Sequence, residues 1–244
     1  MLHQLNLRNI LFLDIETVPQ FGSFNQLSDR FSELWIKKYS TLKRDVVDPP
    51  EISYKRAGIY AEFGKIICIS CGYFGNGNTF RIKSFYGHDE KELLKDFSLM
   101  LERSFSTPDK LLCAHNGKEF DFPYMCRRLL VNLLPLPQLL EIAGKKPWEI
   151  QHIDTMELWK FGDYKSFTSL NLLAAIFDIP TPKDDIDGSM VGDVYWEEQN
   201  IERIVSYCQK DVLTVAQIIR KFRGEKLIED FNVEYAEDFQ LSKE

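Results

Sequence analysis

The chain has 244 residues, of which 44% are hydrophobic and 27% are charged, values typical of a globular protein with one large α/β domain. It contains no apolar run near the ~20 residues that a membrane helix requires, and its first residues lack the cationic and apolar blocks of a secretory signal. The formal net charge of −7 argues against an extended basic surface that coats nucleic acid, but it allows an enzyme that holds a few nucleotides around a cation. The five scattered cysteines fit reduced thiols in a cytoplasm. Together with the lack of a long apolar run, this leads us to expect a cytoplasmic protein without a membrane partner.

The first half of the chain predicts three strands and a helix. Residues 9–16 form a compact run rich in β-branched and aromatic side chains, which is typical of a central strand. Residues 65–74 and 79–87 read as strands joined by a Gly-Asn-Gly-Asn turn, a strong hairpin signal. Residues 89–105 have apolar positions at helical spacing after Asp89. Residues 20–60 have patchy helical spacing, and we interpret them as an insertion, part helix and part loop.

The second half alternates strands and helices. Strands are expected at 110–116 and 149–155, and helices at 119–134, at 169–178, and over 196–223 as one long helix or two in series. The tail, about 224–244, is acidic and weakly patterned. This order predicts a single domain over residues 1–244 with an α/β fold, in which a mixed five-stranded sheet carries helices on both faces.

Two acidic residues close the first predicted strand. Asp14 and Glu16 are at positions i and i+2, so both side chains project from the same face of the strand. Two like charges held together repel each other and lose hydration, and a divalent cation with its need for oxygen ligands reverses that penalty. The alternative is that both acids are simply solvated at a strand end.

The other chemically informative residues lie on predicted helices. Asp121 would fall in the first turn of the helix that follows strand 110–116, where the helix dipole alone favours an acid. Tyr207 and Asp211 have i, i+4 spacing and therefore share one helix face, where they could equally form a surface polar pair. Each pattern has an ordinary structural explanation, so a functional interpretation depends on their combination.

In combination, the segments LFLDIET, AHNGKEFDFPYM and SYCQKDVLTV resemble the three exonuclease motifs of the DEDD superfamily, in its tyrosine-containing branch. The resemblance covers about residues 9–222 and is to predicted bacterial exonucleases related to the proofreading domain of family-B DNA polymerases. It implies a ribonuclease-H-like fold and metal-dependent 3′→5′ hydrolysis of nucleic acid. The catalytic residues that it implies are Asp14, Glu16, Asp121, Tyr207 and Asp211.

The resemblance also implies two divalent cations, Mg²⁺ or Mn²⁺. Asp14 would bridge both ions, Glu16 and Asp211 would hold the first, and Asp121 would hold the second. Tyr207 would orient the attacking water, because a phenol with a pKa near 10 is a poor base at neutral pH. The candidate substrate contacts are Thr17, Asn116, Phe120 and Lys183. Ordinary alternatives are a turn-forming role for Asn116, core packing for Phe120 and a solvated loop position for Lys183.

Two further patterns have less functional weight. Cys68 and Cys71 match the C-x-x-C spelling, but residues i and i+3 of a strand point to opposite faces, so we expect neither a redox pair nor a zinc site. Asp154 ends the strand predicted at 149–155 and could act in the outer shell of the metal site. Its other interpretation, which we favour, is the N-cap of the following helix.

The expected partner is nucleic acid, either single-stranded or at a 3′ end, with DNA favoured slightly over RNA. A polymerase or repair partner in trans is compatible with the sequence. The insertion has four basic residues that could line a lid over the substrate: Lys37, Lys38, Lys43 and Arg44. The alternative function is a catalytically inactive nuclease-like module that binds nucleic acid or protein. A decayed site should have lost at least one acid, yet all four acids and the tyrosine are present.

Overall fold

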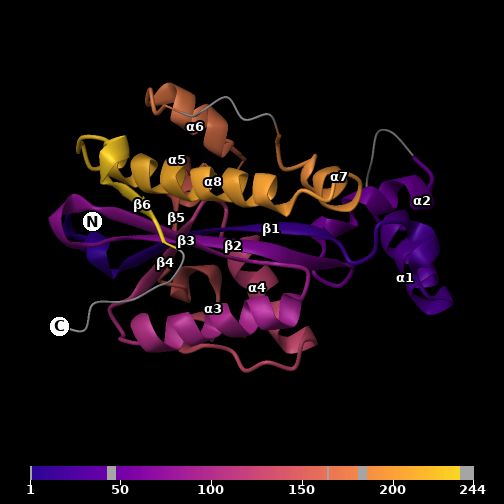
Figure 1. Cartoon of the computed structure of the whole chain (residues 1–244). Coiled ribbons are helices and arrows are strands. Elements are labelled where there is room, and N and C mark those ends of the chain that lie inside the picture. The colour runs from indigo at the N-terminus through magenta and orange to yellow at the C-terminus, as the bar shows by residue number, and fades with distance from the viewer. Residues whose placement is uncertain (1, 43–47, 164, 181–185, 237–244) are drawn as a thin grey trace.

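A mixed six-stranded sheet with strand order β5-β4-β1-β2-β3-β6 forms the centre of the protein in the computed structural model (Figure 1). The structure describes residues 2–42, 48–163, 165–180 and 186–236. The strands are β1 (Ile10–Pro19), β2 (Gly64–Phe74), β3 (Phe80–Tyr86), β4 (Leu111–Ala114), β5 (Ile153–Asp154) and β6 (Val233–Tyr235). β2 is antiparallel to β1 and β3, whereas the β1–β4, β4–β5 and β3–β6 pairs are parallel.

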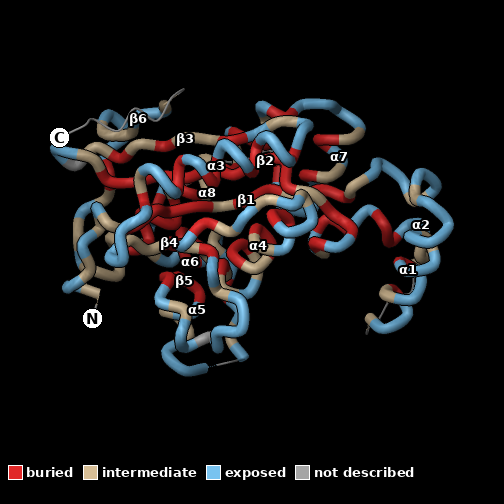
Figure 2. The backbone as a smooth tube through the Cα atoms, turned by 90° about the horizontal axis from the view of Figure 1, so that it is seen from below, coloured by how far each residue is buried: buried red, intermediate tan, exposed pale blue. Residues whose placement is uncertain are grey.

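Helices cover both faces of the sheet, as predicted. Figure 1 shows α3 (Glu90–Ser104) and α4 (Asp121–Val131) on one side. The other side carries α5 (Thr155–Lys160), α6 (Leu170–Ile176), α7 (Val191–Trp196) and α8 (Ile201–Phe222). The middle of the sheet is therefore enclosed, and Figure 2 shows β1 and β2 buried between the two layers. Within the described ranges, no helix is both long and apolar enough to span a bilayer.

The edges of the sheet differ from the sequence prediction. Five strands were expected, but residues 233–235 of the tail add β6 beside β3, with Val233 opposite Phe80. A three-residue edge strand has too little apolar alternation to be recognised in an acidic segment. β5 is also shorter than predicted, because it pairs with β4 only through Ile153 and Asp154.

Local signals placed most of the other elements correctly, but the prediction that Asp14 and Glu16 close the first strand is wrong, because β1 continues through its pairing with β2 to Pro19. The side chain of Asp89 accepts hydrogen bonds from the backbone N–H groups of Lys91 and Glu92 and so caps α3. The helix expected over 196–223 is mainly α8, which begins at Ile201 because the side chain of Asn200 accepts from the Arg203 N–H. α7 lies before the predicted range, meets it only at Trp196, and was not expected from the sequence.

The insertion consists of α1 (Asp29–Ser40), α2 (Pro50–Ser53) and 3₁₀ turns, at one end of the sheet (Figure 1). It has an aromatic core of its own, in which Trp35 and Tyr54 are buried and their rings meet edge to face. The indole N–H of Trp35 donates to the Pro50 carbonyl at 2.8 Å. Of the basic residues proposed for a lid, Lys38 lies over the Tyr60 ring, and positions 43 and 44 fall outside the described residues.

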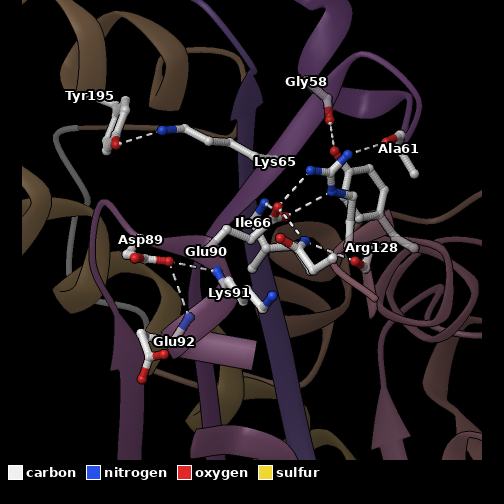
Figure 3. A network of polar contacts seen from close by, with 12 residues as sticks. Gly58, Ala61, Lys65, Ile66, Asp89, Glu90, Lys91, Glu92, Arg128 and Tyr195 are labelled. Carbon is white, nitrogen blue, oxygen red and sulfur yellow. Dashed lines mark hydrogen bonds and ion pairs between the residues drawn. The ribbon is translucent and has the colours of Figure 1, made fainter. Parts of the chain in front are cut away.

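A buried ion pair joins the helices on one face to the sheet. The carboxylate of Glu90 in α3 accepts from Nε of Arg128 in α4 at 2.8 Å and from the Ile66 N–H of β2 at 2.7 Å (Figure 3). The remaining guanidinium donors reach the second Glu90 oxygen and the Ala61 carbonyl. Because both charges are fully buried, each depends on the other for its solvation.

Removal of one partner from this pair should therefore destabilise the fold. We expect Arg128→Met or Glu90→Leu to lower the free energy of unfolding by about 3–5 kcal/mol, and the double variant to lose much less than the sum. Urea unfolding of the four proteins measures this. Lys55→Met, which removes an exposed pair with Asp193, is the control and should cost less than about 1 kcal/mol. Additive losses in the double variant would contradict the coupling.

Candidate active site

Alternate residues of β1 face opposite layers, and this alternation positions the first two acids. Leu13 packs into the cluster formed with α3 and α4. Phe12 packs against α8 near its middle, and Val18 packs against the first turn of α8. Asp14 and Glu16 lie between Phe12 and Val18 in the same row, so two acids interrupt an otherwise apolar row of side chains.

Helix α8 lies along this row. Val212 and Val215 contact the Phe12 end, and Cys208, one turn before Val212, is placed against Asp14. The Cys208 sulfur is 3.3 Å from Oδ2 of Asp14 and 3.4 Å from the Asp14 carbonyl oxygen. The potential ligand atoms of Asp14, Glu16 and Cys208 all lie within 4.8 Å of one another.

Tyr207 and Asp211 belong to this acidic cluster and not to the outer surface of α8. Both are half-buried, and the Tyr207 hydroxyl donates a hydrogen bond to Asp211. Burial raises the pKa of Tyr207, and the negative charges of Asp211, Glu16 and Asp14 raise it further. The phenol is therefore protonated at neutral pH, and the i, i+4 pair faces Asp14 and Glu16.

Asp121 joins the cluster from the opposite layer. It is the first residue of α4, only 3% of it is exposed, and its carboxylate accepts a hydrogen bond from the backbone of Ile15, between the two acids of β1. Burial and the nearby charges of Asp154 and Asp211 raise its pKa to about 7. The structure thus brings together all five residues that the sequence predicted as catalytic.

The charges that act on β1 are of one sign. Burial is the main cause that raises the pKa of Asp14, and Glu16, Asp211 and Asp121 add to the shift. Burial and Asp211 likewise raise the pKa of Glu16. Glu16 is 7% exposed, and among the described residues no hydrogen-bond donor reaches its carboxylate. Such a set of oxygen donors fits a divalent cation, which compensates the repulsion.

Asp154 holds the loop between β4 and α4. Its Oδ1 accepts from the N–H groups of Asn116 at 3.0 Å and Met156 at 2.9 Å, and its Oδ2 accepts from the Lys118 N–H at 3.1 Å. The first and third bonds fix the loop that leads to Asp121, and the second caps α5. The favoured interpretation as an N-cap is confirmed, and the same carboxylate also positions this loop.

The structure gives the predicted substrate contacts local roles. Asn116 has a φ of 63°, a turn conformation that Asn tolerates well, and Phe120 packs against the core beside the Tyr124 ring. Thr17 follows a register shift in β1, and its hydroxyl hydrogen-bonds Tyr124. Lys183 lies outside the described residues. Contact of these four residues with a substrate stays a prediction.

The positions of the cysteines test the C-x-x-C interpretation and reveal one residue that was not predicted. Cys71 packs with the α3–α4 layer, whereas Cys68 packs with Val205 and Cys208 below α8, so the two residues of the C-x-x-C spelling face opposite sides as expected. Cys208 was not among the residues predicted for the site. The available signal was its spacing, because residues 208, 212 and 215 share the buried face of a helix.

Comparison with known proteins places these features in a family. The family described as "predicted 3′-5′ exonuclease related to the exonuclease domain of PolB" matches residues 59–228, well over half of the chain. The chain belongs to this family. The match includes the segments with Asp121, Tyr207 and Asp211, while Asp14 and Glu16 precede it. The predicted relationship to family-B polymerases is thus confirmed, and the bacterial origin stays a prediction.

Other comparisons add a structural neighbour of this exonuclease-family chain. The family B DNA polymerase from the hyperthermophilic archaeon Pyrobaculum calidifontis is similar at 15% sequence identity and a TM-score of 0.49. The similarity covers 87% of this chain and 24% of the polymerase chain, so the chain spans about a quarter of the polymerase's length. A search of curated proteins gave no match.

The buried acids predict a pH-dependent stability. The pKa of Asp121 is raised from 3.8 to about 7 on folding, so the folded protein favours the protonated form. The stabilising contribution of this group is complete below about pH 4 and is lost as the pH rises through 7. In metal-free protein, Asp121→Asn should therefore raise the melting temperature by at least about 2 °C at pH 8, with no gain at pH 4.

Calorimetry of the wild-type and Asp121→Asn proteins between about pH 4 and pH 8 measures the difference in melting temperature. Asp96→Asn, an exposed acid of α3, serves as the control and should show the same difference at every pH. A pH-independent effect of Asp121→Asn would show that its carboxyl does not titrate in this window.

Proposed function

We propose that this chain is a metal-dependent 3′→5′ exonuclease that hydrolyses the terminal phosphodiester bond of a nucleic acid. One observation carries the proposal. Side chains from three distant segments converge on one buried cluster, in which Glu16, Asp211 and Asp121 all raise the pKa of Asp14. Membership of a family described as predicted 3′-5′ exonucleases supports the reaction and its polarity.

The acids would hold two divalent cations, Mg²⁺ or Mn²⁺. Asp14, Glu16 and Asp211 offer oxygen ligands for one ion, and Asp14 with Asp121 for a second. Ions bound there lower the pKa of a water molecule and stabilise the charge that develops on the departing 3′ oxygen. The protein's contribution is to keep its carboxylates close together in spite of their repulsion, because the apolar contacts of Phe12 and Val18 fix both ends of the row.

Tyr207 would orient the attacking water. Burial and the nearby carboxylates raise its pKa above that of an ordinary phenol, which favours positioning over proton abstraction as its role. The hydroxyl donates to Asp211, and its lone pairs are able to accept a hydrogen bond from water. This holds the nucleophile in line with the phosphate, which is a positioning effect and not proton transfer.

The substrate would enter with its 3′ end at this cluster. Asn116 and Thr17 lie on the loop and strand that carry Asp121 and Glu16, so they are the nearest candidates for contacts to the last nucleotide. Phe120 would contact a base, and Lys183 a phosphate. We favour single-stranded DNA or a DNA 3′ end over RNA, and action in trans with a polymerase or repair protein.

A labelled-end assay tests the activity and its polarity. Wild-type protein with Mg²⁺ or Mn²⁺ should shorten 5′-labelled DNA stepwise from the 3′ end, which gives a ladder of labelled strands. With 3′-labelled DNA, the label should leave as a mononucleotide in the first step. Asp14→Asn should reduce hydrolysis to background with an unchanged circular dichroism spectrum. Asp163→Asn, an exposed acid, should retain full activity. Single-stranded DNA, duplex DNA and RNA are compared in parallel.

No nucleotide release by wild-type protein from any of these substrates would favour the inactive-module alternative. An Asp14→Asn protein that remains active would remove the metal mechanism.

The tyrosine has its own test. Tyr207→Phe should lower kcat at least about tenfold, because the water loses its orientation, while Mn²⁺ stabilises both proteins against heat to the same extent. Tyr195→Phe is the matched control, since its hydroxyl contacts Lys65 and His88 and should leave kcat unchanged. An unaltered kcat in Tyr207→Phe would exclude the proposed role.

A further inference from the structure

One side chain of the acidic cluster is chemically unlike the others. Cys208 is fully buried, and its sulfur lies 3.3 Å from Oδ2 of Asp14. In this arrangement the thiol donates to the carboxylate, as a neutral hydrogen-bond donor. The sulfur, one Asp14 oxygen and one Glu16 oxygen lie within 4.8 Å of one another.

This spacing is close to that of ligands around one ion. With bonds of about 2.0–2.2 Å to oxygen and 2.3 Å to sulfur, the ligand atoms of a tetrahedral zinc lie roughly 3.3–3.8 Å apart. The three ligand atoms come from β1 and α8 and are already gathered at one place. Magnesium and manganese take oxygen ligands, whereas zinc and cadmium bind thiolate in preference.

Glu16 supplies an independent indication that this point binds a cation. It is 7% exposed, and among the residues that the structure describes its carboxylate receives no hydrogen bond. The neighbouring charges of Asp211 and Asp121 are negative as well. A carboxylate that is nine-tenths buried among like charges is a suitable ligand for a cation.

We propose that Asp14, Glu16 and Cys208 form a binding site for one thiophilic divalent ion, Zn²⁺ or Cd²⁺. When this ion is bound, Mg²⁺ or Mn²⁺ cannot occupy the same carboxylates. When the ion binds, the thiol releases its proton to solvent and the sulfur becomes a thiolate ligand, with no change of oxidation state. The remaining positions around the ion are open to water or Asp211. Thiophilic ions would therefore inhibit hydrolysis. This inhibition rests on the proposed nuclease function, whereas binding of the ion does not depend on it.

Cadmium is the probe, because a cadmium–thiolate bond absorbs in the near ultraviolet and so reports sulfur ligation without any assay of activity. Metal-free full-length protein is titrated with Cd²⁺. Wild-type protein should develop the band with a one-to-one end point. Cys208→Ser should lack the band and bind Cd²⁺ at least about tenfold more weakly. Cys126→Ser removes the partly exposed cysteine and should behave as wild type, which excludes that surface thiol as the source of the band.

Two further variants protect the test against misfolding. Cys208→Ala removes the ligand without adding a hydroxyl, and Asp14→Asn keeps the sulfur but removes a charged oxygen. Both should weaken Cd²⁺ binding while the melting temperature shows a folded protein. If Cys208→Ser binds Cd²⁺ with wild-type affinity, or if Cys126→Ser is the variant that loses the band, the proposal is wrong.

Inhibition separates this proposal from the nuclease function. In excess Mg²⁺, micromolar Zn²⁺ should inhibit hydrolysis by wild-type protein, and Cys208→Ser should need at least about tenfold more Zn²⁺ for the same inhibition. If the cadmium band appears but no metal supports hydrolysis, the nuclease proposal fails and the metal site stands. If hydrolysis occurs but no cadmium band forms, the metal-site proposal fails and the nuclease proposal stands.

Discussion

Repulsion between buried carboxylates is the interaction on which the rest of the site depends. Asp14 and Glu16 occupy a row of β1 that faces α8, where neighbouring positions hold Phe12 and Val18. Burial of these apolar side chains against α8 is worth about 1.5–3 kcal/mol for each residue, and it draws the acids out of water as well. The acids cannot move to the other face of the sheet, because the strand fixes the direction of their Cα–Cβ bonds. The fold therefore holds these like charges together at the expense of its own stability, and a bound cation would offset that cost.

The surrounding layers act as supports of this arrangement. Asp121 reaches the cluster only because α4 begins at that residue, and the start of α4 depends on the loop that Asp154 holds through its bonds to Asn116 and Lys118. At the other end of α4, Arg128 is tied to Glu90 and to β2. One helix is thus fixed to the sheet at two levels by buried, charge-assisted hydrogen bonds, which keep the Asp121 carboxylate in place more accurately than apolar packing alone.

Sequence patterns predicted the parts of this structure that depend on local rules. The i, i+2 spacing placed Asp14 and Glu16 on one face, and Asp89 marked the start of α3. Contacts between elements that are far apart in the sequence leave no local pattern of this kind. Asp121 and the Tyr207–Asp211 pair needed the family resemblance, because a helix face shows no sign of what it packs against. β6 was missed for a related reason: its three residues become a strand only through pairing with β3.

The chemistry of position 208 follows from the geometry of α8. Tyr207 and Asp211 lie on one face of α8. Successive residues of a helix are rotated by about 100° around its axis, so Cys208 points away from that face, and it contacts Asp14. An acid there would add a further buried charge, and a large apolar residue would displace the Asp14 carboxylate. A small residue that donates a weak hydrogen bond avoids both costs, and Cys208 meets this requirement. The choice of sulfur places a soft atom among hard oxygens, so the packing constraint that positions Asp14 is also the origin of the proposed preference for thiophilic ions.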